Sequence, residues 1–161
     1  MDEILTILEK DARTTPEEIS RMTKKSVADV KKAIKKFEQS GLIVKYKAIL
    51  NKELVKEESH PVRALIEVKI APQKDVGFDN MAERIYKFHE VVSCHLVSGT
   101  YDLLLVVEGK DLQTVARFVA EKLSPMENVR GTVTHFLLKT YKEDHDILVK
   151  PEKDKRIAII L

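Results

Sequence analysis

The sequence has one cysteine, no tryptophan and no long apolar run. A disulfide needs two cysteines, so Cys94 cannot form one within the chain. No stretch approaches the ~18 apolar residues of a membrane-spanning helix. The N-terminal stretch MDEILTILEKD carries acids where a secretory signal needs a basic start and a longer apolar core. We therefore expect a cytoplasmic protein without membrane contact, and 161 residues suffice for one domain or two small ones.

Sequence motifs for metal sites and enzyme active sites are also missing. There are five histidines, namely His60, His89, His95, His135 and His145. None has a metal-ligand spacing such as HExxH, and the adjacent Cys94 and His95 would point to opposite faces of a strand. No phosphate-binding glycine loop, nucleophile elbow or cluster of catalytic carboxylates is present. We therefore expect no metal, no cofactor and no enzymatic activity.

Positive charge is concentrated in one segment, although the whole chain has a net charge of only +2. Residues 24–47 contain eight lysines and two acids, a net charge of +6, so the rest of the chain carries −4. Such an asymmetry indicates a local surface for a polyanion.

The first fifty residues have the pattern of three short helices followed by a pair of strands. Thr15-Pro16-Glu17-Glu18 has the capping hydroxyl, the proline and the acid of a helix start, and Ser26 to Asp29 repeats the capping spacing. Only residues 22–25 remain as a turn, which predicts a helix-turn-helix. Ser40-Gly41 ends the third helix. The alternating, β-forming stretch 42–50 is expected to supply the strands of a wing.

A second pattern follows a polar, charged linker at residues 51–61. Strands are expected at 62–71, 91–97, 102–108 and 132–142, and helices at 78–88 and 111–123. This βαββαβ order predicts an α+β fold, in which a winged helix-turn-helix domain (1–50) precedes a ferredoxin-like domain (62–142). The tail, 143–161, is expected to form a hairpin or to add a strand to a neighbouring sheet.

Two of the predicted strands are apolar on both sides. Leu103, Leu105 and Val107 point one way and Leu104 and Val106 the other. A ferredoxin-like sheet has helices on one face only, so its second face should be polar in a monomer. A dimer formed sheet to sheet explains the pattern, and a loop or the tail covering this face is the alternative.

The third helix should display its lysines. Val27, Val30, Ile34 and Phe37 form one apolar stripe, which leaves the lysines on the outside. A solvated charged face would look similar, but few acids balance these lysines, and the helix is the second of a helix-turn-helix pair. We therefore expect it to bind double-stranded DNA.

Roles in DNA binding follow from position along the segment. The helix start should bind phosphate through Lys24, Lys25 and Ser26. Base edges are expected to meet Ala28, Asp29 and Lys32. Phosphates are expected to bind Lys35, Lys36, Lys45 and Lys47, and Lys31, which flanks this surface, is a further predicted DNA contact. Because this face has no arginine, sequence readout is expected to depend partly on DNA shape.

These features together resemble the Lrp/AsnC, or feast/famine, family of transcriptional regulators, from about residue 2 to residue 142. The most specific similarity is LVSGTYDLLL, like the family's glycine-x-x-aspartate turn before an apolar strand. SVADVKKAIKKFEQSGLIVKY is similar to the family's recognition helix and following strand, and VRGTVTHFLLK to its last strand. The resemblance departs at Lys24, where the family often has glycine, and in the tail after residue 143.

The resemblance implies a homodimer that assembles further, to tetramers or octamers, and a small-molecule effector, commonly an amino acid, bound beside the glycine-x-x-aspartate turn. The implied effector site comprises Ser98, Gly99, Thr100, Tyr101, Asp102, Thr132 and Thr134. Glycine permits close backbone approach and a carboxylate can bind an ammonium group. Turns favour glycine and aspartate for their own sake, so a purely structural role for both remains open.

Two other functions remain open at this point. Siroheme decarboxylases resemble the same family in both domains, although an enzyme of that kind would leave the lysine-rich helix without a purpose. A largely non-specific DNA-compacting protein would have the same basic surface and would differ in its specificity ratio.

Overall fold

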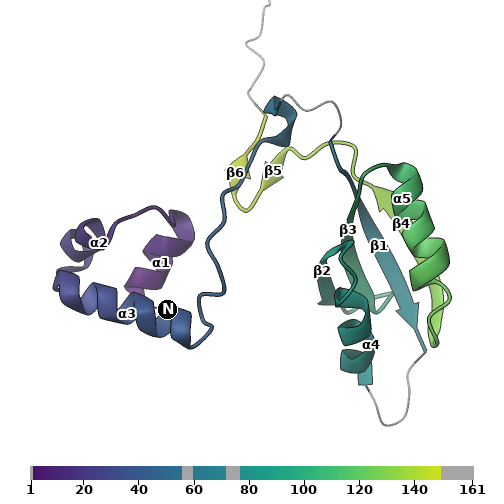
Figure 1. Ribbon diagram of the computed structural model, residues 1–161, viewed down its shortest axis with the longest axis horizontal. Coiled ribbons are helices and arrows are strands. Elements are labelled where there is room, and N and C mark those ends of the chain that lie inside the picture. Colours follow the sequence, from purple (N-terminus) through teal and green to yellow (C-terminus); the bar gives the residue numbers. More distant parts are fainter. Residues whose placement is uncertain (1, 56–59, 72–76, 150–161) are drawn as a thin grey trace, which may run out of the picture. The chain divides into compact units, whose positions relative to one another are not determined.

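The computed structural model of the chain describes residues 2–55, 60–71 and 77–149 (Figure 1). The chain divides into two compact units, residues 1–50 and residues 51–161. No helix in these described ranges is long and apolar enough to cross a lipid bilayer.

The first unit contains the three expected helices, α1 (Glu3–Lys10), α2 (Pro16–Thr23) and α3 (Val27–Gln39). The predicted caps are present: the Thr15 hydroxyl accepts a hydrogen bond from the backbone of Glu18, and that of Ser26 accepts one from Asp29. Ile4, Leu8, Ile19 and Val30 form the buried core of this unit. Each helix contributes to this core, so the three helices depend on one another for burial.

The predicted wing strands are wrong for this chain. Residues 44–50 contain no regular secondary structure, and Val44 is 87% exposed. The stretch does leave α3 as expected, through a left-handed Gly41, and the Ile43 amide donates to the carbonyl of Phe37. A strand needs a hydrogen-bonded neighbouring strand, and neither sheet formed by the described residues includes residues 44–50.

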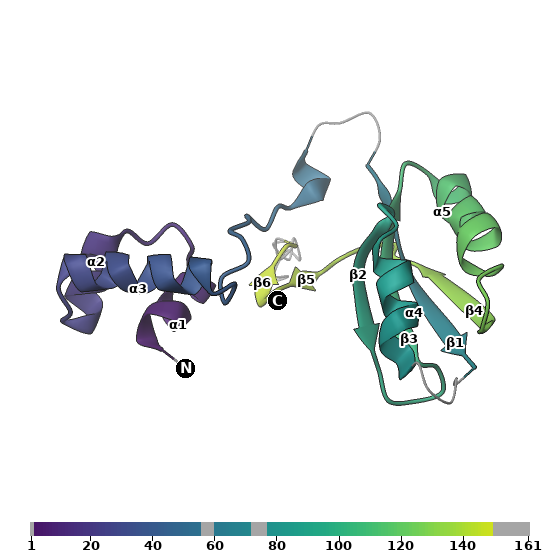
Figure 2. The same ribbon diagram turned by 60° about the horizontal axis from the view of Figure 1, so that its bottom comes forward.

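The second unit is built on one antiparallel sheet of β1 (Val62–Ile70), β2 (Val91–Leu96), β3 (Leu103–Gly109) and β4 (Val129–Phe136), in the order β2-β3-β1-β4. Helix α4 (Gly77–Tyr86) joins β1 to β2. Helix α5 (Leu112–Phe118), continued by the π-helical turn η2 (Val119–Leu123), joins β3 to β4. Both helices lie on one face of the sheet (Figures 1 and 2). The predicted ferredoxin-like fold is therefore confirmed.

Strand register separates the two faces of this sheet. Leu103, Leu105 and Val107 of β3 stand opposite Val68, Ile66 and Ala64 of β1, and all six side chains are 0% exposed beneath the helices. Their neighbours along the strands point away from the helices. We call this second surface the open face; it consists of Arg63, Leu65, Glu67, Lys69, Ser93, His95, Leu104, Val106, Glu108, Val133 and His135.

The last strand and the tail differ in detail from the sequence prediction. Strand β4 ends at Phe136, although an apolar pattern continues to Tyr141. Its pairing with β1 ends at Phe136, opposite Ala64, and the amide of Leu137 makes one further bond, to the carbonyl of Arg63 near the start of β1. A hairpin of β5 (Lys142–Glu143) and β6 (Asp146–Ile147) follows, while residues 150–161 of the predicted tail lie outside the described residues.

A cluster of four charged side chains fastens this hairpin to the sheet. Arg63 donates through Nε to Glu108, which stands opposite it on β3, and through Nη1 to Glu143 of the hairpin at 2.9 Å. Lys52 donates to the same Glu108 oxygen at 2.9 Å. Burial alone would raise the pKa of Glu108, but hydrogen bonds from Lys52 and Arg63 outweigh it and bring that pKa below its ordinary value.

The cluster should contribute to stability at neutral pH and lose that contribution in acid. A carboxylate with a lowered pKa in the folded state stabilises the fold above its ordinary pKa of 4.5, and the effect disappears as the pH falls through the folded value. We expect Glu108→Gln to lower the melting temperature at pH 7 by a few degrees, or about 1 kcal/mol. The difference from the unmodified protein should shrink below about pH 4.

Thermal unfolding followed by circular dichroism between about pH 3 and pH 7 measures both effects. Glu127→Gln, at an exposed glutamate, is the matched control and should leave the profile unchanged. A constant difference between Glu108→Gln and the unmodified protein over the whole pH range would contradict this account of the cluster.

Candidate functional site

The outer surface of α3 is lined with cations, as the sequence predicts. Val30 is fully buried and Ile34 and Phe37 pack against the core of the first unit, which orients the helix. All of the predicted DNA contacts are exposed: Lys24, Lys25, Ser26, Ala28, Asp29, Lys31, Lys32, Lys35, Lys36, Lys45 and Lys47. A helix held by one apolar stripe and covered with lysines on its other sides can lie against a polyanion without unfolding any core.

The turn between α2 and α3 is closed by an unusual residue. Lys24 adopts the left-handed conformation, with φ 57° and ψ 21°, a region that favours glycine. The hydroxyl of Ser20 donates across the turn to the carbonyl of Lys25 at 2.6 Å, and that of Thr23 donates to the carbonyl of Ile19 at 2.8 Å. These bonds hold the turn in shape although a lysine occupies the strained position.

Several candidate DNA contacts already have partners within the unit. The hydroxyl of Ser26 caps α3 by accepting from the Asp29 amide, and it donates to the Asp29 carboxylate at 2.6 Å, so the two side chains bind each other. Lys31 lies 3.0 Å from Glu17 of α2, and this hydrogen bond lowers the pKa of Glu17. Both side chains are more than half exposed, so a phosphate could compete for the lysine. Asp29 is consequently less available to base edges than the sequence alone suggests.

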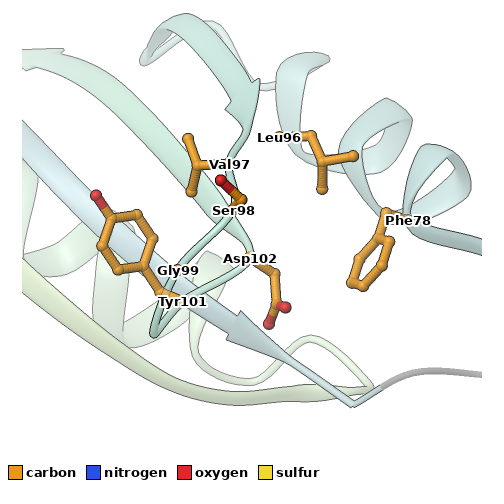
Figure 3. A pocket seen from close by; sticks show the side chains of 7 residues that line it. All are labelled: Phe78, Leu96, Val97, Ser98, Gly99, Tyr101 and Asp102. Carbon is orange, nitrogen blue, oxygen red and sulfur yellow. The ribbon is translucent and has the colours of Figure 1, made fainter.

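A shallow pocket of about 430 Å³ lies at the end of the sheet where the turn 98–102 joins β2 to β3. Its lining includes three side chains with polar groups, of Ser98, Tyr101 and Asp102; the other lining residues are Phe78, Leu96, Val97 and Gly99 (Figure 3). Phe78 comes from the first turn of α4, so the pocket lies between this helix and the turn that follows β2. Such a mixture suits a small ligand with one apolar part and one charged part.

Asp102 holds this end of the sheet together. Its carboxylate oxygen Oδ2 accepts a hydrogen bond from the amide of Ile70 at 2.7 Å, and its own amide donates to the carbonyl of Val68. The Asp102 carbonyl accepts from the amide of Val97, which closes the turn. Asp102 is therefore structural here, and its carboxylate also reaches the pocket.

Packing within one protomer does not require a glycine at position 99. A Cβ atom added at Gly99 would meet no described atom within 4 Å. The open space beside the backbone is where a ligand or another chain can approach closely.

The structure brings four of the seven predicted effector residues into one pocket: Ser98, Gly99, Tyr101 and Asp102. Thr100 does not line it. Thr132 and Thr134 stand opposite Val68 and Ile66 on β4, on the far side of β1 from β3.

The sequence analysis missed Phe78, Leu96 and Val97. The last two adjoin the turn in sequence and could have been included on that ground. Phe78 comes close only through the tertiary fold, so no local signal identifies it.

The described ranges contain no group of three metal-ligating side chains close enough to hold an ion. Register places Cys94 opposite Leu105 on the helix-covered face and His95 opposite Leu104 on the open face. The opposite orientations predicted for these neighbours are confirmed.

Comparison with known families gives matches to both units. A family described as the Lrp/AsnC ligand binding domain matches residues 63–147, and one described as winged helix-turn-helix DNA-binding matches residues 3–44. The uncharacterized HTH-type transcriptional regulator YugG of Bacillus subtilis is 44% identical over 157 residues, covering 98% of this chain and 94% of its own.

More distant relatives span almost the same length. The HTH-type transcriptional regulator FL11 of Pyrococcus furiosus is 29% identical over 91% of this chain and 93% of its own. Among solved structures, a transcriptional regulator of Neisseria meningitidis in complex with L-methionine superposes with a TM-score of 0.68. That regulator is 28% identical, and the match covers 89% of this chain and 93% of the other.

The left-handed turn at Lys24 has a measurable cost. A residue with a Cβ atom in this conformation is roughly 1 kcal/mol less stable than glycine, so Lys24→Gly should raise the stability of the first unit by about that amount. Lys25→Gly is the matched control: it removes the same charge at a position without positive φ, and it should destabilise the unit. Urea unfolding of both variants tests this; equal losses of stability would show that Lys24 carries no backbone strain.

Proposed function

Because the chain belongs to the Lrp/AsnC family of transcriptional regulators, we propose that α3 binds the major groove of double-stranded DNA and that the pocket beside the turn 98–102 binds an amino acid effector. Membership confirms the predicted family and the predicted function as a DNA-binding regulator, and the relatives that match are transcriptional regulators rather than enzymes. We place the protein in the cytoplasm, with its target DNA.

The observation that carries the DNA proposal is the exposed lysine surface of α3, set on a rigid helix-turn-helix. An α-helix fits the major groove, and lysines on its flanks can reach phosphates on both sides. The first turn of α3 presents the small side chain of Ala28, and the next presents Lys32. We assign base-edge contacts to these two residues and phosphate contacts to the other lysines, and we assign Ser26 and Asp29 mainly to the helix cap.

The open face supports assembly into dimers. Val133 is 51% exposed and Leu65, Leu104 and Val106 are half-buried, whereas the residues of β1 and β3 that face the helices are fully buried. A second copy that packs the same face against this one would bury these side chains through a two-fold interface. Two copies of α3 could then bind two half-sites of a pseudo-palindromic operator. We propose the domain division made above, with residues 1–50 for DNA, 51–61 as linker and 62–142 for assembly and effector.

The pocket lining supports an effector with an apolar side chain. Phe78 and Leu96 offer apolar contact, and the Asp102 carboxylate can bind an ammonium group. The relative from Neisseria meningitidis, whose structure contains L-methionine, supports the same class of ligand. Three predicted residues, Thr100, Thr132 and Thr134, lie outside the pocket of one protomer. We propose that they contact the effector only when further copies of the chain assemble around it.

The DNA proposal is tested by selecting bound fragments from the source genome and measuring the affinity of the best fragment against a scrambled control at several salt concentrations. A specific regulator should prefer the selected fragment by ~1000-fold or more. Lys32→Glu should weaken that binding by about 100-fold or more, because it replaces a groove cation with an anion. Lys10→Glu, on the exposed end of α1, makes the same charge change as a control and should have a small effect.

Equal and steeply salt-dependent affinity for both fragments would favour the DNA-compacting alternative. Unchanged affinity in Lys32→Glu, with the control also unchanged, would remove α3 from the interface.

The effector proposal is tested with L-methionine as the probe, by calorimetry and by its effect on DNA affinity. Asp102→Asn keeps an oxygen that can accept from the Ile70 amide and removes only the charge. We expect this variant to lose L-methionine binding by at least about tenfold, with DNA affinity in the absence of L-methionine unchanged. Asp102→Ala should in addition lower the melting temperature, because it leaves the Ile70 amide without its acceptor. Unaltered binding of L-methionine to Asp102→Asn would make Asp102 purely structural.

A further inference from the structure

One charged side chain lies within the apolar part of the open face. Glu67 of β1 stands opposite Leu104 of β3 on one side and Val133 of β4 on the other. Its side chain is 29% exposed, less than that of many surface acids. If a second sheet covers this face, the Glu67 carboxylate is buried between two aliphatic side chains. Burying a charge is costly unless a hydrogen-bonding or oppositely charged partner group accompanies it.

His135 provides this partner. It lies on β4 opposite Leu65, diagonally from Glu67, and its Nε2 atom is 3.1 Å from the Glu67 oxygen Oε1. The imidazole is 53% exposed in the single protomer, so water can still reach the pair. Imidazoles ordinarily change charge between about pH 5 and pH 8, a range in which glutamate side chains ordinarily stay charged.

Covering this face changes the energetics of the pair. A neutral imidazole can donate one hydrogen bond to Glu67 but leaves a full negative charge within the interface. A protonated imidazole neutralises that charge, and loss of water strengthens the attraction between the two groups. A two-fold interface would bring two such pairs together, so two unneutralised carboxylates would also repel each other.

From this geometry we propose that sheet-to-sheet dimerisation takes up protons on His135, so the dimer is tight below neutral pH and weaker above it. The proposal rests on the dimer proposed above and adds its regulation. Because one proton is taken up for each protomer, the dissociation constant of the dimer can rise by up to ~100-fold per pH unit above the imidazole's titration range.

Other charged groups on the open face do not explain such a dependence. Arg63 and Glu108 bind each other and their neighbours in the charged cluster. Lys69 follows Glu67 on the same face of β1, two residues along the strand, but its side chain is exposed and no ion pair between the two is seen among the described residues. Arginine, lysine and glutamate side chains ordinarily keep their charge between pH 6 and pH 8. His95 of β2 is the second imidazole on this face; it stands opposite Leu104, and no carboxylate contact of His95 is seen among the described residues.

Sedimentation equilibrium of the full chain at about pH 6, 7 and 8, at constant ionic strength, tests the proposal. We expect the dissociation constant of the unmodified dimer to rise at least tenfold from pH 6 to pH 8. Glu67→Gln should dimerise tightly with little dependence on pH, because its amide carries no charge to neutralise. His135→Gln should dimerise weakly at every pH, and His95→Gln should retain the pH dependence of the unmodified protein. Thermal unfolding of each variant shows whether it is folded at the pH values used.

Distinct results would overturn distinct parts of the proposal. A dimer whose affinity does not change with pH overturns the proton uptake and leaves the dimer itself in place. A pH dependence that persists in folded His135→Gln, or that disappears in His95→Gln, overturns the assignment to the Glu67–His135 pair. A protein that is monomeric at every pH overturns the dimer and the proton uptake together, and it would favour the tail as the cover of the open face.

Discussion

A four-stranded sheet that has both helices on one side and apolar side chains on the other must have that other side covered, and much of this protein's behaviour depends on what covers it. Alternate residues of β1 and β3 face opposite ways, so the same strands that form a fully buried core beneath α4 and α5 also present leucine and valine to the outside. Burial of apolar area is the largest favourable contribution to association. One protomer therefore buries the apolar side chains on the helix-covered face of its sheet, but it leaves those on the open face exposed to water.

The fold was largely predictable because its signals are local. Capping residues identify the starts of α2 and α3, and apolar spacing identifies the helices and the strands of the second unit. The failures concern partners distant in sequence. Residues 42–50 have strand-like alternation without a neighbouring strand, and β4 stops pairing near the start of β1 although its own apolar pattern continues. Alternation indicates the ability to pair, but a strand also needs a neighbour.

At the two candidate sites, too, local features could be predicted from the sequence and contacts between distant segments could not. The cationic surface of α3 could be predicted residue by residue, since helical periodicity fixes which side chains face outward. Its internal contacts could not: the Lys31–Glu17 pair joins two helices, and the left-handed geometry at Lys24 depends on the bonds across the turn. The pocket was only half predictable, because Phe78 reaches the turn 98–102 from another element, and Thr132 and Thr134 lie across an intervening strand.

The hydrogen bond from the Ile70 amide to Asp102 has a consequence for any ligand of the pocket. A carboxylate has two oxygens with about four acceptor positions, and this bond uses one position on Oδ2. An ammonium group can therefore dock without displacing the amide, and the carboxylate is already fixed in place before the ligand arrives. Little side-chain entropy of Asp102 is then lost when a ligand binds. The hydrogen bond that stabilises this end of the sheet therefore also preorganises the pocket for its ligand.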